Sequence, residues 1–184
     1  MCKVRAKTTT FATAKRQRSV NVENEREITV CFTGHRSYDG RGAAALRESV
    51  RRHYAAGYRI FITGAAAGFD LAAGECVLSL RGELPGLELH CAVPYAGHCK
   101  GFDEAARSSY EHIVGNADDV VVLSPRYDSR VYHRRNDYMI ERSSAVIAWF
   151  DGTSGGTEYT VRRAVQQGLD IENLWLGLFS GGEL

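Results

Sequence analysis

Several segments of this chain are apolar from end to end, and a segment with helical spacing follows each one. The apolar segments lie at 28–33, 58–63, 87–93, 120–123 and 145–150, with a further one expected within 169–176. Strands without polar alternation are buried on both faces, which is typical of a parallel sheet. Their alternation with helices predicts a doubly wound α/β domain with a mostly parallel sheet and helices on both faces.

The intervening segments carry apolar residues three and four positions apart, the spacing of one face of a helix. We expect helices at 41–56, 69–80, 101–114, 135–143 and 159–167. Gly57 and Gly168 follow the first and last of these, and a glycine directly after a helical pattern is a common stop signal.

Charge divides the chain into two parts. Residues 1–26 contain seven Lys or Arg and two Glu, a net charge of +5, whereas 27–184 carry a net charge of −4. The first part has almost no apolar periodicity, so we expect a disordered basic tail at 1–26 and a single domain at 27–184. Two interpretations of the tail stay open: a basic arm for nucleic acid or an acidic partner, and a solvated extension.

The five cysteines form no CxxC pair, and Cys31 and Cys91 lie inside apolar strand patterns. This usage suits a reducing compartment, and with neither a secretory pattern nor an 18-residue apolar run we expect a cytoplasmic protein without membrane contact. His90, His98 and Cys99 offer too few ligands for a zinc site. We therefore expect no metal and no cofactor.

Three of the strands end in polar, glycine-bearing segments: Thr33-Gly34-His35-Arg36, the run from Gly64 to Asp70, and Asp151-Gly152-Thr153-Ser154-Gly155-Gly156-Thr157-Glu158. In an open α/β sheet, ligands bind beyond the carboxyl ends of the strands, where the strand order reverses. The last segment joins a strand to a helix start, and bare backbone N–H groups at the positive end of a helix bind phosphates. The sequence therefore predicts a site for a phosphorylated ligand.

Particular side chains can be assigned to this edge. The Arg36 guanidinium either binds phosphate oxygens, which its shape suits, or is an ordinary surface arginine. His35 is a phosphate donor, an acid, a helix cap or a structural residue. Gly64 and Gly68 would expose backbone amides, but they do not form a dinucleotide fingerprint. Asp70 either compensates a helix dipole or contacts a ribose hydroxyl or substrate amine.

A second group precedes the fifth strand. Arg135 and Asn136 either face the same edge and bind phosphate and base, or Asn136 caps the short helix that they open. Tyr127, Tyr132 and His133 come before them in an expected loop, which we interpret as a lid with stacking rings.

The last glycine segment supplies the remaining candidates, namely Gly155, Gly156 and Thr157 for phosphate and Glu158 for catalysis. A carboxylate beside a bound ribose could stabilise an oxocarbenium-like transition state during N-glycosidic cleavage. The alternative for Glu158 is an acidic residue in the first turn of a helix.

The runs TGHR, TGAAAGFDLAAGE and RNDYMIERSSAVIAWFDGTSGGTEYTVRRAVQQG resemble the SLOG superfamily, which joins the DNA-processing protein DprA/Smf with the LOG phosphoribohydrolases. The resemblance is to its small YpsA-like or YoqJ-like members and covers roughly residues 27–176. It implies a Rossmann-like sheet, a site for nucleotides or nucleotide-derived signals, and a homo-oligomer. Gly64, Gly68 and Asp70 match the turn shared with DprA.

The same resemblance makes Gly155, Gly156 and Thr157 a phosphate turn but leaves Glu158 out of register. Hydrolytic LOG enzymes carry PGGxGTxxE, whereas here the glutamate directly follows the threonine. A shift of two positions turns a helical side chain by roughly 200°. We therefore expect a protein that binds a nucleotide-like small molecule, with a sensor as one form that this function could take. Whether it is an enzyme is left open, with a nucleoside 5′-monophosphate phosphoribohydrolase as the alternative. DprA-like single-strand DNA binding is the second alternative, and only the basic tail favours it.

Overall fold

The computed structural model describes residues 25–177, and the predicted basic tail falls almost entirely outside them. Six parallel strands form one sheet in the order β4-β3-β2-β1-β5-β6. The strands are β1 Thr29–Gly34, β2 Ile60–Thr63, β3 Glu88–Val93, β4 Asp119–Val122, β5 Ala145–Trp149 and β6 Asp170–Asn173. This sheet confirms the predicted doubly wound α/β class.

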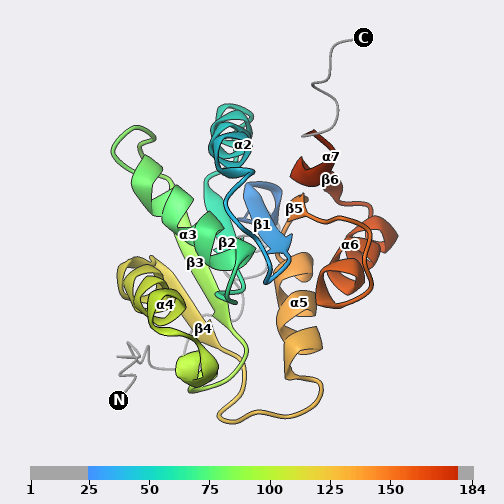
Figure 1. Cartoon of the computed structure of the whole chain (residues 1–184). Helices are drawn as coiled ribbons and strands as arrows, with labels where there is room; N and C mark the ends of the chain where they lie inside the picture. The colour runs from blue at the N-terminus through green and yellow to red at the C-terminus, as the bar shows by residue number, and fades with distance from the viewer. Residues whose placement is uncertain (1–24, 178–184) are drawn as a thin grey trace, which may run out of the picture.

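Helices cover both faces of the sheet (Figure 1). Their bounds are α2 Ala43–Ala55, α3 Phe69–Leu80, α4 Glu104–Asn116, α5 Val131–Glu141, α6 Gly156–Gln166 and α7 Leu174–Gly177, with a 3-10 turn, η1, at His98–Gly101. Residues of α2, α3 and α4 share one apolar core with the sheet, and those of α5 and α6 share the other. The domain is therefore a three-layer sandwich.

Strand β1 shows why its sequence is apolar throughout. Val30 and Phe32 belong to the core under α2 and α3, while Cys31 between them belongs to the core under α5 and α6. All three side chains are fully buried. Successive residues of a strand point to opposite faces, so a strand covered on both sides needs apolar residues at every position.

The strand order reverses next to β1. The chain adds β2, β3 and β4 on one side of β1, then returns to place β5 and β6 on its other side. Residues Val30 to Gly34 pair in register with Ala145 to Trp149. The loops that leave β1 and β5 therefore diverge to opposite faces, which opens a crevice between the two carboxyl ends.

Helix α5 begins four residues earlier than predicted, at Val131 in place of Arg135. The start is set by Asp128, whose carboxylate accepts the Arg130 N–H at 2.9 Å and pairs with Arg134. Asn136 lies inside the helix, so of its two predicted interpretations the capping role is wrong.

Two other boundaries differ for a similar reason. Helix α4 starts at Glu104 because Asp103 caps it, accepting the Ala106 N–H at 2.8 Å. The predicted final strand stops at Asn173, where the side-chain Oδ1 accepts the Trp175 N–H at 3.2 Å and α7 begins. In both places a short polar side chain captures a backbone N–H group and sets the boundary.

We predict that Gly34→Ala destabilises the fold by roughly 1–3 kcal/mol, the usual range for overpacking a core. An added Cβ would lie 2.5 Å from Cβ, Cγ and Cδ1 of the fully buried Phe69. Urea unfolding measures the loss. Gly82→Ala is the matched control, because its Cβ meets no atom within 4 Å, and it should change stability by less than about 0.5 kcal/mol. Equal stability of the two variants would contradict the prediction.

Candidate functional site

A cavity of about 410 Å³ lies at the switch point, beyond the carboxyl ends of β1 and β5. Residues of the β1 end, α3, α5 and the start of α6 line it together. Eight predicted site residues are among them: Gly34, His35, Arg36, Asp70, Arg135, Asn136, Gly156 and Thr157. Four others are not: Gly64, Gly68, Gly155 and Glu158. Residues that are far apart in the sequence, and that the sequence analysis assigned to the ends of the strands, thus lie around one cavity.

A buried ion pair stands at one side of this cavity. Arg135 Nη1 donates to Asp70 Oδ2 at 3.1 Å, and the two residues are only 7% and 5% exposed. Burial raises the pKa of the Asp70 carboxyl, although Arg135 and the Ala66 N–H favour its charged form. Burial likewise lowers the pKa of Arg135, which Asp70 opposes. Each ion is therefore held in a dry environment chiefly by the other.

Gly64 makes room for this pair. A Cβ at that position would lie 1.5 Å from Arg135 Nη1 and 2.6 Å from Asp70 Oδ2. Gly68 has φ +87°, and its Cβ would lie 2.5 Å from the Arg36 carbonyl oxygen. The geometry gives both glycines a packing role, since they allow the β2–α3 turn to pack closely against the ion pair and the β1 loop. Their predicted ligand contacts stay a prediction.

The two glycines at the start of α6 have different surroundings from those of Gly64 and Gly68. A Cβ at Gly155 or Gly156 would meet no atom within 4 Å, so neither residue is required by packing in the described structure. Helix α6 starts at Gly156, and no side chain caps its N-terminus in the part of the chain that is described. Its first N–H groups and the positive end of its dipole therefore face an uncapped turn, with Gly156 and Thr157 lining the cavity.

Asn136 holds this turn from the opposite helix. Its Nδ2 donates to the Gly156 carbonyl oxygen at 3.3 Å, and the Thr160 hydroxyl donates to the same oxygen at 2.9 Å. Asn136 is 5% exposed. A buried amide from α5 therefore fixes the first residue of α6 relative to the cavity.

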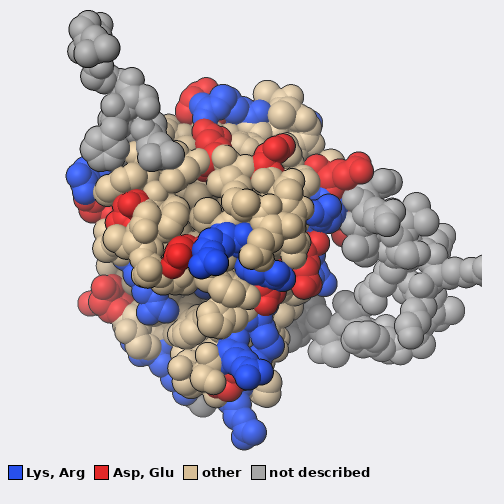
Figure 2. All heavy atoms as spheres, turned by 90° about the vertical axis from the view of Figure 1, so that its right-hand side faces the viewer, with Lys and Arg blue, Asp and Glu red and all other residues tan. Residues whose placement is uncertain are grey.

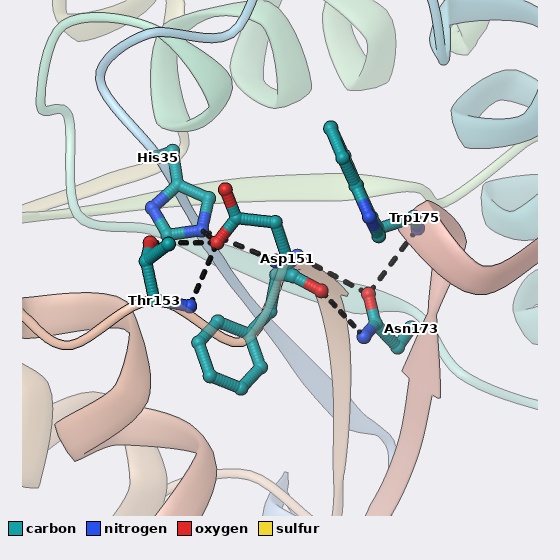
Figure 3. A network of polar contacts seen from close by, with 6 residues as sticks. His35, Asp151, Thr153, Asn173 and Trp175 are labelled. Atoms are coloured by element: carbon teal, nitrogen blue, oxygen red, sulfur yellow. Dashed lines mark hydrogen bonds and ion pairs between the residues drawn. The ribbon is translucent and has the colours of Figure 1, made fainter.

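His35 links the loops after β1 and β5, as Figure 3 shows. Its Nε2 lies 2.8 Å from Asp151 Oδ1, and that oxygen also accepts the Thr153 hydroxyl at 2.6 Å and the Thr153 N–H at 2.9 Å. The Thr153 hydrogen bonds, and then His35, hold the pKa of the Asp151 carboxyl below its usual range. This network positions the loop that leads to the glycine turn.

A second contact secures the same loop at its base. The Phe150 N–H donates to Asn173 Oδ1 at 3.1 Å, and Asn173 Nδ2 donates to the Phe150 carbonyl oxygen at 2.8 Å (Figure 3). The amide side chain thereby continues the pairing of β5 with β6 for one further step. The loop after β5 therefore starts from a fixed position.

Glu158 lies outside the cavity lining. Its carboxylate is 3.7 Å from Arg162 Nη1, one turn further along α6, and its side chain is 33% exposed. Such a pair on a helix surface contributes little, about 0.3–0.5 kcal/mol. The geometry fits the alternative interpretation of Glu158 as an acidic residue in the first helical turn.

Tyr132 and His133, predicted to lie in a loop, belong to the first turn of α5, and both line the cavity. Tyr132 also contacts a cluster of aromatic rings at 5.8–6.3 Å between centroids: Tyr95, His98 and Tyr127. His98 is 3% exposed, and neither of its ring nitrogens has a hydrogen-bond partner among residues 25–177. Burial, with Arg135 and Arg36 nearby, lowers its pKa to about 4.

Sequence reasoning missed other residues of the site. Met139 and Ser129 line the cavity, and Asp151 anchors His35. Asp151 could have been found, because it is the first polar residue after the fifth apolar segment. Met139 gave no such signal, since a buried methionine on a helix is typical of a core.

Charges around the cavity favour an anion. Asp70 and Arg135 neutralise each other, and Asp151, which contacts His35, is not among the lining residues. Arg36, which lines the cavity from an exposed position, adds a cation to the positive end of α6. The fold and this cavity together define a Rossmann-like α/β protein with an anion-suited pocket at the switch point of its sheet.

The model of the YspA SLOG family matches residues 43–174, and the chain belongs to this family. UPF0398 proteins of Bacillus thuringiensis (strain Al Hakam) and Bacillus cereus (strain AH187) are each 29% identical to it over 158 residues. The match covers 78% of this chain and 85% of each relative. The predicted resemblance to the SLOG superfamily is thereby confirmed.

Two solved structures share the fold. DNA processing protein A (DprA) from Streptococcus pneumoniae has a TM-score of 0.58 and 17% identity, covering 90% of this chain and 64% of that one. DprA from Helicobacter pylori, whose structure concerns its single-stranded DNA binding mode, has a TM-score of 0.58 and 16% identity, covering 87% and 74%. This chain thus spans less than two thirds of the Streptococcus protein, and the likeness shows the fold alone.

None of the helices within 25–177 has the length and apolar character needed to cross a membrane. The same residues contain no group of three or more His, Cys, Asp or Glu side chains placed to hold a metal ion.

We predict that Asp70 and Arg135 are energetically coupled, so that replacing both residues destabilises the fold by less than the sum of the two single replacements. Asp70→Asn or Arg135→Met alone should destabilise the fold by about 3–5 kcal/mol, because each leaves an unpaired charge or polar group buried. The double variant should cost less than the sum of the two. A double-mutant cycle from urea unfolding measures the coupling, and losses that add within about 0.5 kcal/mol would show that the pair is not coupled.

We also predict that His98 makes the fold acid-sensitive. Its pKa is 6.5 in the unfolded chain and about 4 in the fold, so the stabilisation from a neutral His98 is full above pH 6.5 and is lost as pH falls towards 4. The loss is about 3 kcal/mol. His98→Phe should reduce the fall in unfolding free energy between pH 6.5 and 4 by this amount. Parallel pH profiles for wild type and His98→Phe would refute the prediction.

Proposed function

We propose that this protein binds a nucleotide or a nucleotide-derived small molecule, with the phosphate at the N-terminus of α6. The observation that carries the proposal is the meeting of three anion-binding features in one cavity. These are the uncapped turn at Gly156 and Thr157, the guanidinium of Arg36, and the buried Arg135.

Arg135 supports the proposal because its guanidinium still has an N–H group that could donate to a ligand. Nη1 donates to Asp70, but the buried Nε has no partner among the described residues. Leaving a buried donor unsatisfied costs about 1–3 kcal/mol, more when the group is charged. A phosphate oxygen in the cavity would accept from such a donor and offset that cost.

The volume of the cavity suits a small-molecule ligand. The cavity of about 410 Å³ falls within the ~300–1,000 Å³ range of ligand pockets. Its wall combines the polar groups named above with the apolar side chains of Phe32 and Met139. A nucleoside monophosphate has the corresponding combination of a charged end and a flat apolar end.

Binding without turnover is the better-supported form of this function. The carboxylate expected to serve a phosphoribohydrolase, Glu158, does not line the cavity and pairs with Arg162. Asp70, the carboxylate that does line it, is engaged with Arg135. A sensor role is consistent with this arrangement, because a ligand would be held without a free carboxylate beside it.

Single-strand DNA binding is the other candidate, motivated by the DprA structures. Binding along a nucleic-acid backbone needs a continuous positive surface. On the face that carries α6, blue and red side chains are interspersed in Figure 2, and residues 27–184 sum to −4. Apart from Arg26, the basic residues of the predicted tail lie outside the described structure, so deletion of 1–26 is the test for this alternative.

We predict that Gly156→Ala weakens nucleotide binding at least tenfold while leaving stability within about 0.5 kcal/mol. The added methyl group meets no protein atom within 4 Å and would occupy the space proposed for phosphate. Isothermal titration with AMP and ADP-ribose measures the affinity, and Gly82→Ala is the matched control. Unchanged affinity in Gly156→Ala would place the phosphate elsewhere.

Thermal-shift and chromatographic assays in the same samples separate binding from turnover. A ligand at a hundred times its dissociation constant stabilises the fold by about 2.7 kcal/mol. Stabilisation without released base supports the binding function. Base release that disappears in Glu158→Gln would establish the phosphoribohydrolase instead, and no stabilisation by any phosphorylated compound would overturn the proposal.

The homo-oligomer expected from the family resemblance stays a prediction. Sedimentation at micromolar concentration, with and without AMP, measures the assembly state directly. A monomer under both conditions would contradict it.

A further inference from the structure

Three tyrosines from three segments meet beside the cavity. The ring centroids of Tyr95, Tyr127 and Tyr132 lie 5.6–6.3 Å apart, with interplanar angles of 61–76°. Tyr132 lines the cavity, and Tyr127 is 59% exposed. A single exposed tyrosine is ordinary, but a ring cluster continuous with the wall of a polar cavity offers a planar ligand a place to stack.

The cluster is held in place from behind and from the sides. His98 packs against Tyr95 at 5.4 Å and against Tyr132 at 5.8 Å between ring centroids. Burial raises the pKa of the Tyr95 hydroxyl, and the neighbouring Tyr132 raises it further. These rings are therefore positioned before any ligand arrives.

The segment that carries Tyr127 is also anchored at both ends. The Ser124 hydroxyl donates to the Arg126 carbonyl oxygen at 2.7 Å, and the Ser124 carbonyl oxygen accepts the Ala96 N–H at 3.0 Å. On the other side Asp128 pairs with Arg134 of α5 through both carboxylate oxygens. An anchored ring loses less conformational entropy on binding than one on a free loop.

The spacing along α5 relates the cluster to the anion site. Tyr132 and Asn136 are one turn apart on the same face of the helix, a rise of about 6 Å. Asn136 contacts Gly156, where we place the phosphate. A ribose ring would bridge this gap, so that the base of a nucleotide held at α6 reaches Tyr132.

Arg36 stands beside the Tyr132 end of this path and lines the same cavity as Gly156. Its Cζ lies 5.6 Å from the centroid of the Tyr132 ring, further than the 3.7 Å of the stacked pair of Arg142 on Tyr138. At that distance it contributes a cation near the ring without a tight stack. Arg36 can therefore face the phosphate while remaining next to the base.

We propose that Tyr127 and Tyr132, positioned by Tyr95, form the subsite that stacks the nucleobase of the bound nucleotide. This inference rests on the proposed function and adds the part of the ligand that the anion site does not bind. Recognition here is by ring faces, so the subsite tolerates different bases and favours purines, which offer a larger stacking area.

The test compares AMP, UMP and ribose 5-phosphate by isothermal titration, because the last compound keeps the phosphate and lacks the base. Wild type should bind AMP at least tenfold more tightly than ribose 5-phosphate, with UMP between them. Tyr127→Ala should reduce this AMP advantage by about fivefold or more and leave the affinity for ribose 5-phosphate unchanged. Tyr127→Phe, which keeps the ring, is the matched control and should behave as wild type.

Each other outcome removes a specific part of the proposal. Equal affinity of wild type for AMP and ribose 5-phosphate, or an unchanged AMP advantage in Tyr127→Ala, overturns the base subsite while the phosphate site stands. Loss of the advantage in Tyr127→Phe replaces stacking by a hydroxyl contact and likewise overturns it. Failure of all three compounds to bind overturns the proposed function and this inference with it.

Discussion

The ion pair between Asp70 and Arg135 is the interaction around which the cavity is organised. Both charges are buried, so neither tolerates the loss of the other, and Gly64 must lack a side chain for them to meet. The pair joins α3 to α5, helices on opposite faces of the sheet, across the carboxyl ends of its strands. It therefore helps to fix the position of α5 on the sheet, from which Tyr132 and Asn136 line the cavity.

Glycines at the strand ends look alike in the sequence but have different roles in the fold. Gly34, Gly64 and Gly68 are required by close packing, because an added Cβ would collide with Phe69, Arg135 or Arg36. Gly156 has open space around it and lines the cavity, whereas Gly155 has open space but a φ of +153°, a backbone conformation that favours glycine. The proposed phosphate contact therefore narrows to Gly156, together with the cations that line the same cavity. Only the structure separates these roles, since all five glycines lie between an apolar strand and a helix.

Much of the fold follows from the sequence pattern, because continuous apolar strands leave few alternatives to a parallel sheet. Helix α3 starts and ends where its pattern predicts, at Phe69 and Leu80. The predicted ends of helices and strands were wrong where one polar side chain determines where an element begins, as Asp128 does for α5 and Asn173 does for α7. In the site, strand-end residues such as Arg36 were predictable, whereas the pairing of Asp70 with Arg135 was not. Contacts between residues 65 positions apart depend on how α5 lies on the sheet.

The strand order also has a consequence for how the protein is made. Strand β1 lies at the centre of the sheet, but its partner β5 follows it by more than a hundred residues. During synthesis, β2, β3 and β4 can assemble beside β1 while its other edge, Val30-Cys31-Phe32, stays unpaired and apolar. Such an edge is a template for association with other chains, and pairing of distant segments is slow. The nascent chain is therefore most exposed to misassembly until residues 145–149 have left the ribosome, and the strand exposed over that interval is the one whose carboxyl end later lines the cavity.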